Sequence, residues 1–95
     1  MFIINFNFIK PIEEVNQFTV AHRTYVTTQY KNGNFILGGP KVPRSGGLVL
    51  ANCNTEDDVV KILTQDPLIE NKVAEYSLVE FNPILSSEKL KEYIK

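Results

Sequence analysis

The sequence predicts an α+β fold whose elements follow one another in the order β-α-β-β-α-β. Three observations lead to this prediction: a period-two alternation at the start of the chain, two helical patterns with start and stop signals, and turn residues that separate the remaining apolar runs. The chain has 95 residues, of which 43% are hydrophobic and 22% charged. This is the usual size of one domain, so we expect residues 1–95 to form a single domain.

The first strand is expected at residues 2–9, where two kinds of side chain alternate. One face is wholly apolar, and the other mixes isoleucine with asparagine. A strand that buries one side firmly and the other conditionally is typical of the centre of a sheet. The two faces consist of Phe2, Ile4, Phe6 and Phe8, and of Ile3, Asn5, Asn7 and Ile9.

The first helix is expected to begin at Pro11, because proline suits the first helical turn. Glu13 and Glu14 follow, where negative charge stabilises a helix N-terminus. The helix should run to about Tyr30 and end at the Asn-Gly pair of residues 32–33, which favours a left-handed cap. An apolar stripe at helical spacing runs along it: Ile12, Val15, Phe18, Ala21 or His22, Tyr25 and Val26.

Two short strands and a connecting loop follow this helix. Residues 35–37 are apolar and end at the Gly-Gly-Pro sequence of residues 38–40, and residues 48–53 form the third strand. The intervening residues 41–47 contain too much proline and glycine for regular structure. We therefore expect a loop there.

The second helix is expected to begin after Thr55, a favourable N-cap residue with Asp58 three positions later. It should end at Asp66, because the residue before a proline disfavours helix. The last strand is expected at residues 74–81. An extra helix over residues 86–94 should close the chain.

This element order matches the ferredoxin-like split βαβ motif. Right-handed crossovers would place both helices on one face of a four-stranded antiparallel sheet. The opposite, open face carries the mixed side of the first strand, which is too apolar for water and too polar for a conventional core. Such a surface usually marks an interaction site, so we expect a homodimer that forms through the open sheet face.

The composition argues against several classes of function. The net charge is −1, and the basic residues are scattered, so nothing favours a nucleic-acid partner. No apolar run approaches the roughly 20 residues that span a bilayer, and the N-terminus lacks the features of a signal peptide. We therefore expect a cytoplasmic protein without a membrane partner. A single cysteine and a single histidine favour no metal site, and no motif indicates a cofactor.

His22 is the only histidine in the chain and lies beside the apolar stripe of the first helix. It is either a hydrogen-bonded, partly buried helix residue or a general acid/base, because imidazole titrates near physiological pH. Asp66 belongs either to a simple Asp-Pro turn or to a pair with a cation, because the helix dipole disfavours a carboxylate at a C-terminal end. If Asp66 approached His22, it would fix the imidazole tautomer and raise its basicity.

Weaker signals lie at the end of the second strand and in the following loop. Gly39 and Pro40 could bring the backbone close to a ligand, although glycine pairs at strand ends mostly serve turns. Arg44 and Ser45 precede two glycines and could bind a carboxylate or phosphate through the guanidinium and exposed amides. These residues are candidates for substrate binding.

Several short motifs follow one another in a fixed order: His22 in the first helix, Gly33 with residues 35–40, residues 45–47 before an apolar strand, residues 66–68, and residues 80–84. Together they resemble the YCII-related family over roughly residues 1–84. The resemblance implies a ferredoxin-like fold and dimerisation of the dimeric α/β-barrel type. It also implies an active site that uses a histidine and an aspartate, which are His22 and Asp66 in this chain.

Within this family, one known type of member eliminates HCl from a chlorinated hydroxyquinol, and most members have no established activity. This chain departs from the usual pattern in its loop, where residues 41–44 read Lys-Val-Pro-Arg. It also has Leu68 where an aromatic residue frequently follows Asp-Pro. Both departures leave the substrate open.

The leading hypothesis is a small-molecule enzyme of lyase or isomerase type that needs no cofactor. His22 would transfer a proton, Asp66 would orient the ring, and Arg44 or loop amides would hold an anionic or phenolic substrate. The alternative is a non-catalytic ligand-binding or accessory dimer, in which His22 only satisfies a hydrogen bond in the wall of a pocket.

Overall fold

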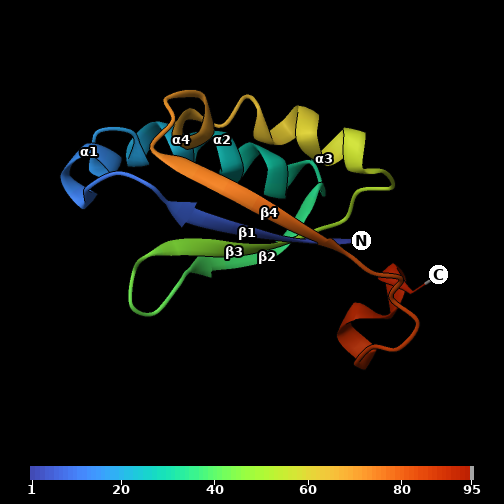
Figure 1. Cartoon of the computed structure of the whole chain (residues 1–95). Coiled ribbons are helices and arrows are strands. Elements are labelled where there is room, and N and C mark those ends of the chain that lie inside the picture. The colour runs from blue at the N-terminus through green and yellow to red at the C-terminus, as the bar shows by residue number, and fades with distance from the viewer. Residues whose placement is uncertain (95) are drawn as a thin grey trace.

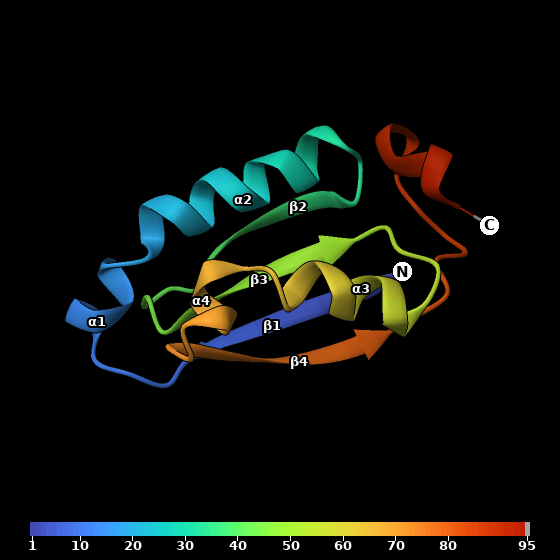
Figure 2. The same cartoon turned by 90° about the horizontal axis from the view of Figure 1, so that it is seen from above.

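A computed structural model describes residues 1–94 and contains a four-stranded antiparallel sheet with the strand order β2-β3-β1-β4. The helices that follow β1 and β3 cover one face of this sheet, and the other face is open (Figures 1 and 2). This arrangement confirms the predicted ferredoxin-like α+β fold. The strands are β1 (Phe2–Phe8), β2 (Phe35–Pro40), β3 (Gly46–Ala51) and β4 (Ala74–Glu80).

The central position of β1 is confirmed, because it pairs with β3 on one side and with β4 on the other. Phe2, Ile4 and Phe6 are at most 3% exposed and lie in the core beneath the helices. Ile3 lies on the open face and is 38% exposed. The alternation in the sequence therefore separates the covered face of the sheet from the open one.

The strands β2 and β3 are longer at their joined ends than the prediction allowed. Pro40 pairs with Gly47. Residues 38–40 therefore belong to β2, and Gly46 and Gly47 belong to β3. The loop is thereby shortened to residues 41–45. The predicted loop over 41–47 was wrong at its end, because Gly46 and Gly47 allow the close approach of a neighbouring backbone and pair as part of β3.

The first helical segment is divided into α1 (Ile12–Asn16) and α2 (Thr19–Lys31). The predicted continuous helix was wrong at Gln17 and Phe18. Phe18 has φ −115° and ψ 0°, and it packs with buried Val15 against a small cluster beneath α1. The break lets both apolar side chains enter this cluster while α2 runs along the sheet.

The end of α2 is formed as predicted. Gly33 has φ +79°, which is the left-handed conformation that glycine adopts without strain. The amide of Asn34 then donates to the carbonyl of Gln29 at 3.0 Å and closes the helix. The chain therefore turns directly from α2 into β2.

The second helical segment is also divided, into α3 (Glu56–Leu63) and α4 (Pro67–Glu70). Thr55 caps α3 as predicted, since its hydroxyl accepts from the amide of Asp58 at 3.2 Å. Asp66 does not end a helix: its side chain caps the start of α4, where Pro67 occupies the first turn. The expectation of a C-terminal position was wrong, because proline suits a first turn as well as it stops a helix.

The terminal helix is present as a 3-10 helix, η1 (Glu88–Tyr93), which follows Ser87. It lies beyond the end of the sheet that carries the N-terminus (Figure 1). The opposite end of the sheet, where α1, α4 and the β2–β3 loop gather (Figure 2), is the end that carries the site described below.

Candidate functional site

His22 and Asp66 form a hydrogen-bonded pair across the layer of helices. The His22 Nδ1 atom lies 2.8 Å from Oδ1 and 2.9 Å from Oδ2 of the carboxylate. The Asp66 side chain is 2% exposed, and the His22 side chain is 25% exposed. The carboxylate is therefore buried behind the imidazole, which remains partly accessible.

The chain around Asp66 explains how a carboxylate is held at this depth. As the N-cap of α4, Asp66 accepts a hydrogen bond from the backbone amide of Leu68 at 2.9 Å. Asp66 Oδ1 thus accepts from an amide, and both oxygens face the ring of His22. A buried carboxylate is costly unless it is paired and hydrogen-bonded. This pair meets both conditions.

The geometry fixes the roles of the two imidazole nitrogens. A carboxylate accepts hydrogen bonds, so the proton of a neutral imidazole lies on Nδ1 and the Nε2 lone pair is free. Nε2 has no hydrogen-bond partner within residues 1–94. The ring of Phe6 meets that of His22 edge-on, with centroids 6.1 Å apart and an interplanar angle of 78°. An aromatic wall thus holds the ring while Nε2 stays available as a base.

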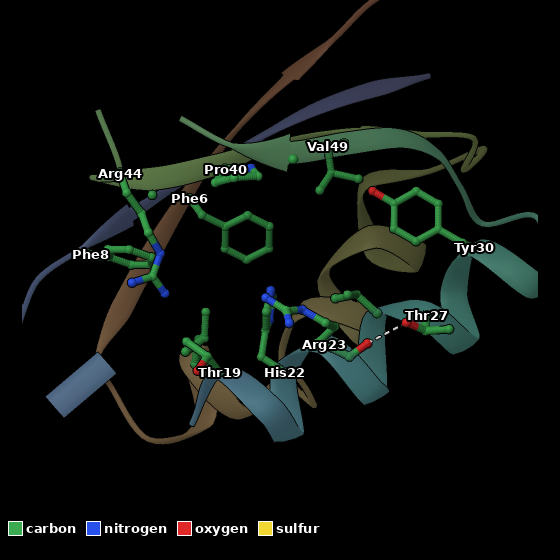
Figure 3. Close-up of a pocket in the computed structure, with 16 residues that line it drawn as sticks. Phe6, Phe8, Thr19, His22, Arg23, Thr27, Tyr30, Pro40, Arg44 and Val49 are labelled. Carbon is green, nitrogen blue, oxygen red and sulfur yellow. Dashed lines mark hydrogen bonds between the residues drawn. The ribbon is translucent and has the colours of Figure 1, made fainter. Parts of the chain in front are cut away.

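His22 lines a cavity of about 310 Å³ between α2 and the β2–β3 end of the sheet. Pockets for small molecules begin at about this size. Figure 3 shows Arg44 and Phe8 at one end of the cavity, Tyr30 at the other, and His22 between them. The walls combine aromatic rings, aliphatic side chains and glycine backbone, and the charged groups come from α2 and from the loop before β3. The cavity therefore suits a flat, compact molecule.

The structure brings most of the sequence candidates together. Gly39, Pro40 and Arg44 line the cavity with His22, and Asp66 lies behind the ring. Ser45 is not one of the lining residues; its backbone carbonyl accepts from the amide of Phe8 at 3.0 Å.

Arg44 is held at one end of the cavity by two contacts (Figure 3). Its Nη1 donates to Asn16 Oδ1 at 2.9 Å. Its guanidinium lies over the ring of Phe8, with the Cζ atom 5.4 Å from the ring centroid. A guanidinium has five N–H donors, so donors remain for an anion in the cavity.

Arg23 and Tyr30 are among the cavity residues that the sequence did not single out as site candidates. Helical spacing could have found Tyr30, which lies eight positions beyond His22 and so shares one face of the helix with it. Arg23 directly follows His22 and carried no such signal. The α2 residues that line the cavity are Thr19, His22, Arg23, Val26, Thr27 and Tyr30.

Two tyrosines of α2 have raised pKa values. Burial raises the pKa of Tyr25, and the nearby carboxylate of Asp66 adds to this effect. The Tyr25 hydroxyl donates to the carbonyl of Ile62 at 2.6 Å and so joins α2 to α3. Burial also raises the pKa of Tyr30. Both hydroxyls therefore keep their protons at neutral pH and act as donors.

The β2 segment that lines the cavity also borders the open face of the sheet. Residues 38–40 line a second hollow there, together with Ile3, Leu37 and Leu48. Leu37 is 68% exposed, Leu48 is 47% exposed, and Val79 on β4 is 57% exposed. The open face thus presents apolar side chains, and one edge strand separates them from the cavity.

Within residues 1–94, no three His, Cys, Asp or Glu side chains gather in a way that would hold a metal ion. No helix in the same part of the chain is long and apolar enough to cross a membrane.

Comparison with known proteins places this geometry in context. A family model described as the YCII-related domain matches residues 1–82. Among solved structures, the fold is similar to that of 5-chloro-2-hydroxyhydroquinone dehydrochlorinase from Burkholderia phenoliruptrix AC1100, in complex with 2,5-dihydroxybenzoquinone. The TM-score is 0.72 at 14% identity, and the match covers 87% of this chain and 95% of the other. No curated protein sequence matches the chain.

Proposed function

The chain belongs to the YCII-related family, and from this membership and the His22–Asp66 pair we propose a small-molecule enzyme of lyase or isomerase type. It works by proton transfer and needs no cofactor. The observation that carries the proposal is the orientation of His22: Nδ1 is bound to a buried carboxylate, and the opposite nitrogen is free beside a cavity. This is the arrangement of a general base with its orienting group.

In the proposed reaction, His22 Nε2 takes a proton from a carbon or hydroxyl of the bound substrate. The electron pair left behind moves into the substrate, and the imidazolium that forms is stabilised by the Asp66 carboxylate. An isomerase would return the proton to a different atom. A lyase would instead expel a leaving group with the electron pair, and the proton would pass to solvent. Asp66 itself stays ionised throughout.

The proposed substrate is a small anionic or phenolic molecule. Arg44 lies at one end of the cavity (Figure 3), and its guanidinium has N–H donors beyond the one bound to Asn16. Gly39 and Pro40 bring the backbone of β2 to the wall of the cavity. The structurally similar dehydrochlorinase was solved with 2,5-dihydroxybenzoquinone, which is a compact, acidic ring of this kind. We therefore propose this quinone as the first probe for the cavity.

We also infer that two copies associate through the open sheet face. The apolar side chains exposed there would be buried by a second sheet packed against the first. Ser45 does not line the cavity, so no part in substrate binding is proposed for it.

The proposal is tested by proton exchange, because exchange requires a base but no leaving group. The ring C–H protons of 2,5-dihydroxybenzoquinone should exchange with deuterium in D₂O faster with the protein than without it, as followed by NMR. Chloride release from 5-chloro-2-hydroxyhydroquinone would report the lyase reaction. The His22→Gln variant should lose the accelerated exchange.

One outcome would favour the alternative function. If the quinone binds in the cavity and its exchange is not accelerated, the chain is a ligand-binding or accessory protein. In that case, His22 would only complete the cavity wall, and His22→Gln would leave the affinity for the quinone largely intact.

A further inference from the structure

The charge of the cavity differs in sign from the charge of the chain. The whole sequence has a net charge of −1, yet Arg23 and Arg44 both line the cavity and no Asp or Glu side chain does. The one carboxylate nearby, Asp66, is buried and paired with His22. A ligand in the cavity therefore meets cations that no acidic residue of the wall neutralises.

Arg23 is the less constrained of the two arginines. Arg44 donates to Asn16 and lies over Phe8, whereas the guanidinium of Arg23 has no hydrogen bond or ion pair within residues 1–94. Arg23 follows His22 directly on α2, and both side chains line the cavity. A planar guanidinium with five donors is well suited to a carboxylate.

The hydroxyl groups that line the cavity also differ in whether they donate to a protein acceptor. Thr19 donates to the carbonyl of Asn16 and Thr27 to that of Arg23. The Tyr30 hydroxyl, in the part of the chain that the structure describes, donates to no protein acceptor. Burial raises its pKa, which keeps the proton on the oxygen.

The backbone opposite Tyr30 is shaped around this hydroxyl. A Cβ atom on Gly38 would overlap the Tyr30 oxygen, and it would also lie 2.7 Å from the carbonyl oxygen of Leu48. Gly38 thus leaves the space that the hydroxyl occupies. Tyr30 is seven residues beyond Arg23 on α2, a rise of about 10 Å along the helix axis. Figure 3 shows Arg44 at one end of the cavity and Tyr30 at the other, with His22 and Arg23 between them. The cavity therefore has a cationic end at Arg44 and a hydroxyl end at Tyr30.

We propose that Arg23 and Tyr30 determine specificity, and that the cavity selects a compact aromatic acid with a second oxygen at the far end of its ring. The carboxylate lies at Arg23 and Arg44, the ring lies against Phe6 and Phe8, and the second oxygen accepts a hydrogen bond from Tyr30. This inference rests on the proposed function, since it places the ring between its two anchors beside Nε2 of His22.

Binding at equilibrium tests this inference without any turnover. The probes are 4-hydroxybenzoate, benzoate and the neutral 4-hydroxybenzyl alcohol, each titrated at neutral pH by calorimetry or amide NMR. We expect 4-hydroxybenzoate to bind about three- to tenfold more tightly than benzoate, the effect of one hydrogen bond. The alcohol should bind at least tenfold more weakly than 4-hydroxybenzoate because it lacks the charge.

Variants assign each effect to its residue. Arg23→Gln should weaken both acids about tenfold and leave the alcohol unchanged, whereas Arg23→Lys should retain most of the affinity. Lys61→Gln removes a positive charge from the exposed side of α3 and is the matched control. Tyr30→Phe should remove the preference for 4-hydroxybenzoate over benzoate, and Tyr76→Phe, which is outside the cavity, should preserve it.

The inference is overturned if neither acid binds at millimolar concentration, or if the alcohol binds as well as the acids. It is also overturned if Arg23→Gln behaves like Lys61→Gln. These outcomes are separate from failure of the proposed function. If the acids bind with the expected preferences and the protein accelerates no proton exchange, then the ligand class stands and the catalytic role does not.

Discussion

The imidazole of His22 and the carboxylate of Asp66, 44 residues apart in the sequence, meet at 2.8 and 2.9 Å through one nitrogen and two oxygens. This contact links α2 to the N-terminus of α4. It leaves the second nitrogen of the ring beside the cavity. Stability and the proposed chemistry therefore depend on the same pair of side chains.

Replacing Asp66 by Asn should separate these two roles. The amide keeps an oxygen for the Leu68 amide, but its NH₂ group favours the imidazole tautomer with the proton on Nε2, which is no longer a base. We expect accelerated proton exchange on the quinone to fall at least tenfold, and the free energy of unfolding to fall by about 1–3 kcal/mol. Exchange NMR and urea unfolding measure the two effects.

Asp57→Asn is the matched control for that experiment, since it makes the same chemical change on the exposed first turn of α3. Surface changes of this kind are usually within about 0.5 kcal/mol. Full exchange activity in Asp66→Asn would contradict the role of the carboxylate in orienting the ring.

Replacing His22 by Gln should abolish the base while keeping an N–H donor for Asp66. We expect accelerated exchange to fall by about 10²- to 10⁴-fold, the usual contribution of a general base. His22→Ala should be less stable than His22→Gln, because it leaves the buried carboxylate without a donor. Exchange rates close to the wild-type value in His22→Gln would refute the catalytic assignment.

Two neighbouring glycines of β2 offer a paired test of the cavity wall. Gly38→Ala places a Cβ atom against the Tyr30 hydroxyl and the Leu48 carbonyl, whereas a Cβ on Gly39 meets nothing within 4 Å. We expect Gly38→Ala to lower the free energy of unfolding by about 1–3 kcal/mol, as overpacking does, and Gly39→Ala to change it little. Urea unfolding of both variants measures the difference.

Adding Tyr30→Phe to Gly38→Ala should restore part of the lost stability, because it removes one of the two overlaps. The Leu48 carbonyl remains, so recovery should be incomplete. Equal losses in Gly38→Ala and Gly39→Ala would contradict the close approach of Tyr30 to β2.

Stability should decline at alkaline pH. Burial raises the pKa of Tyr30 and of Tyr25, and it raises the pKa of the Cys53 thiol, with a further contribution from Asp58. The folded chain therefore holds these protons more tightly than the unfolded chain. Their contribution is complete below the ordinary values of about 8.5 to 10 and is lost as the pH rises through the folded-state values.

Thermal unfolding followed by circular dichroism at increasing pH measures this decline. The decrease should begin above about pH 8.5 and should be shallower in Tyr30→Phe, which has no proton to lose. A melting temperature that stays constant up to pH 11 would contradict the burial of these groups.

The proposed dimer is tested on the open sheet face. Leu48 is 47% exposed in the middle of this face, and Val42 is 97% exposed in the β2–β3 loop. Leu48→Asp should convert a dimer to a monomer, because it places a charge in an apolar interface. Val42→Asp should leave the molar mass of the assembly in solution unchanged. Light scattering after gel filtration measures both, and a monomeric wild-type protein at micromolar concentration would refute the dimer.

The sequence predicted the parts of the fold that depend on local chemistry. The alternation in β1, the Thr55 cap and the glycine after α2 each have a local cause, and each is present. The break at Phe18 was not predictable from periodicity, because it depends on a cluster formed with residues of α4 and β4. Asp66 was assigned to the wrong end of a helix because proline has the same signature before a first turn as after a last one.

The candidate site was predictable to a similar extent. His22 and Asp66 were chosen for their chemistry, and their contact was left open because it depends on how α2 and α4 lie against each other. Arg23 was missed because it directly follows His22 and lies outside the apolar stripe. Tyr30 was missed because helical spacing identifies a shared face without telling whether that face meets a core or a cavity. Only the small residues of β2 and β3, which leave space opposite α2, decide this.

Residues 38–40 of β2 face the cavity on one side and the hollow of the open sheet on the other. Thermodynamic linkage between two such surfaces is reciprocal: if a ligand in the cavity changes affinity for a molecule on the open face, that molecule changes affinity for the ligand by the same factor. A substitution at Gly39 or Pro40 alters both surfaces at once. If the proposed substrate binds in the cavity and the proposed dimer forms on the open face, a single edge strand affects both.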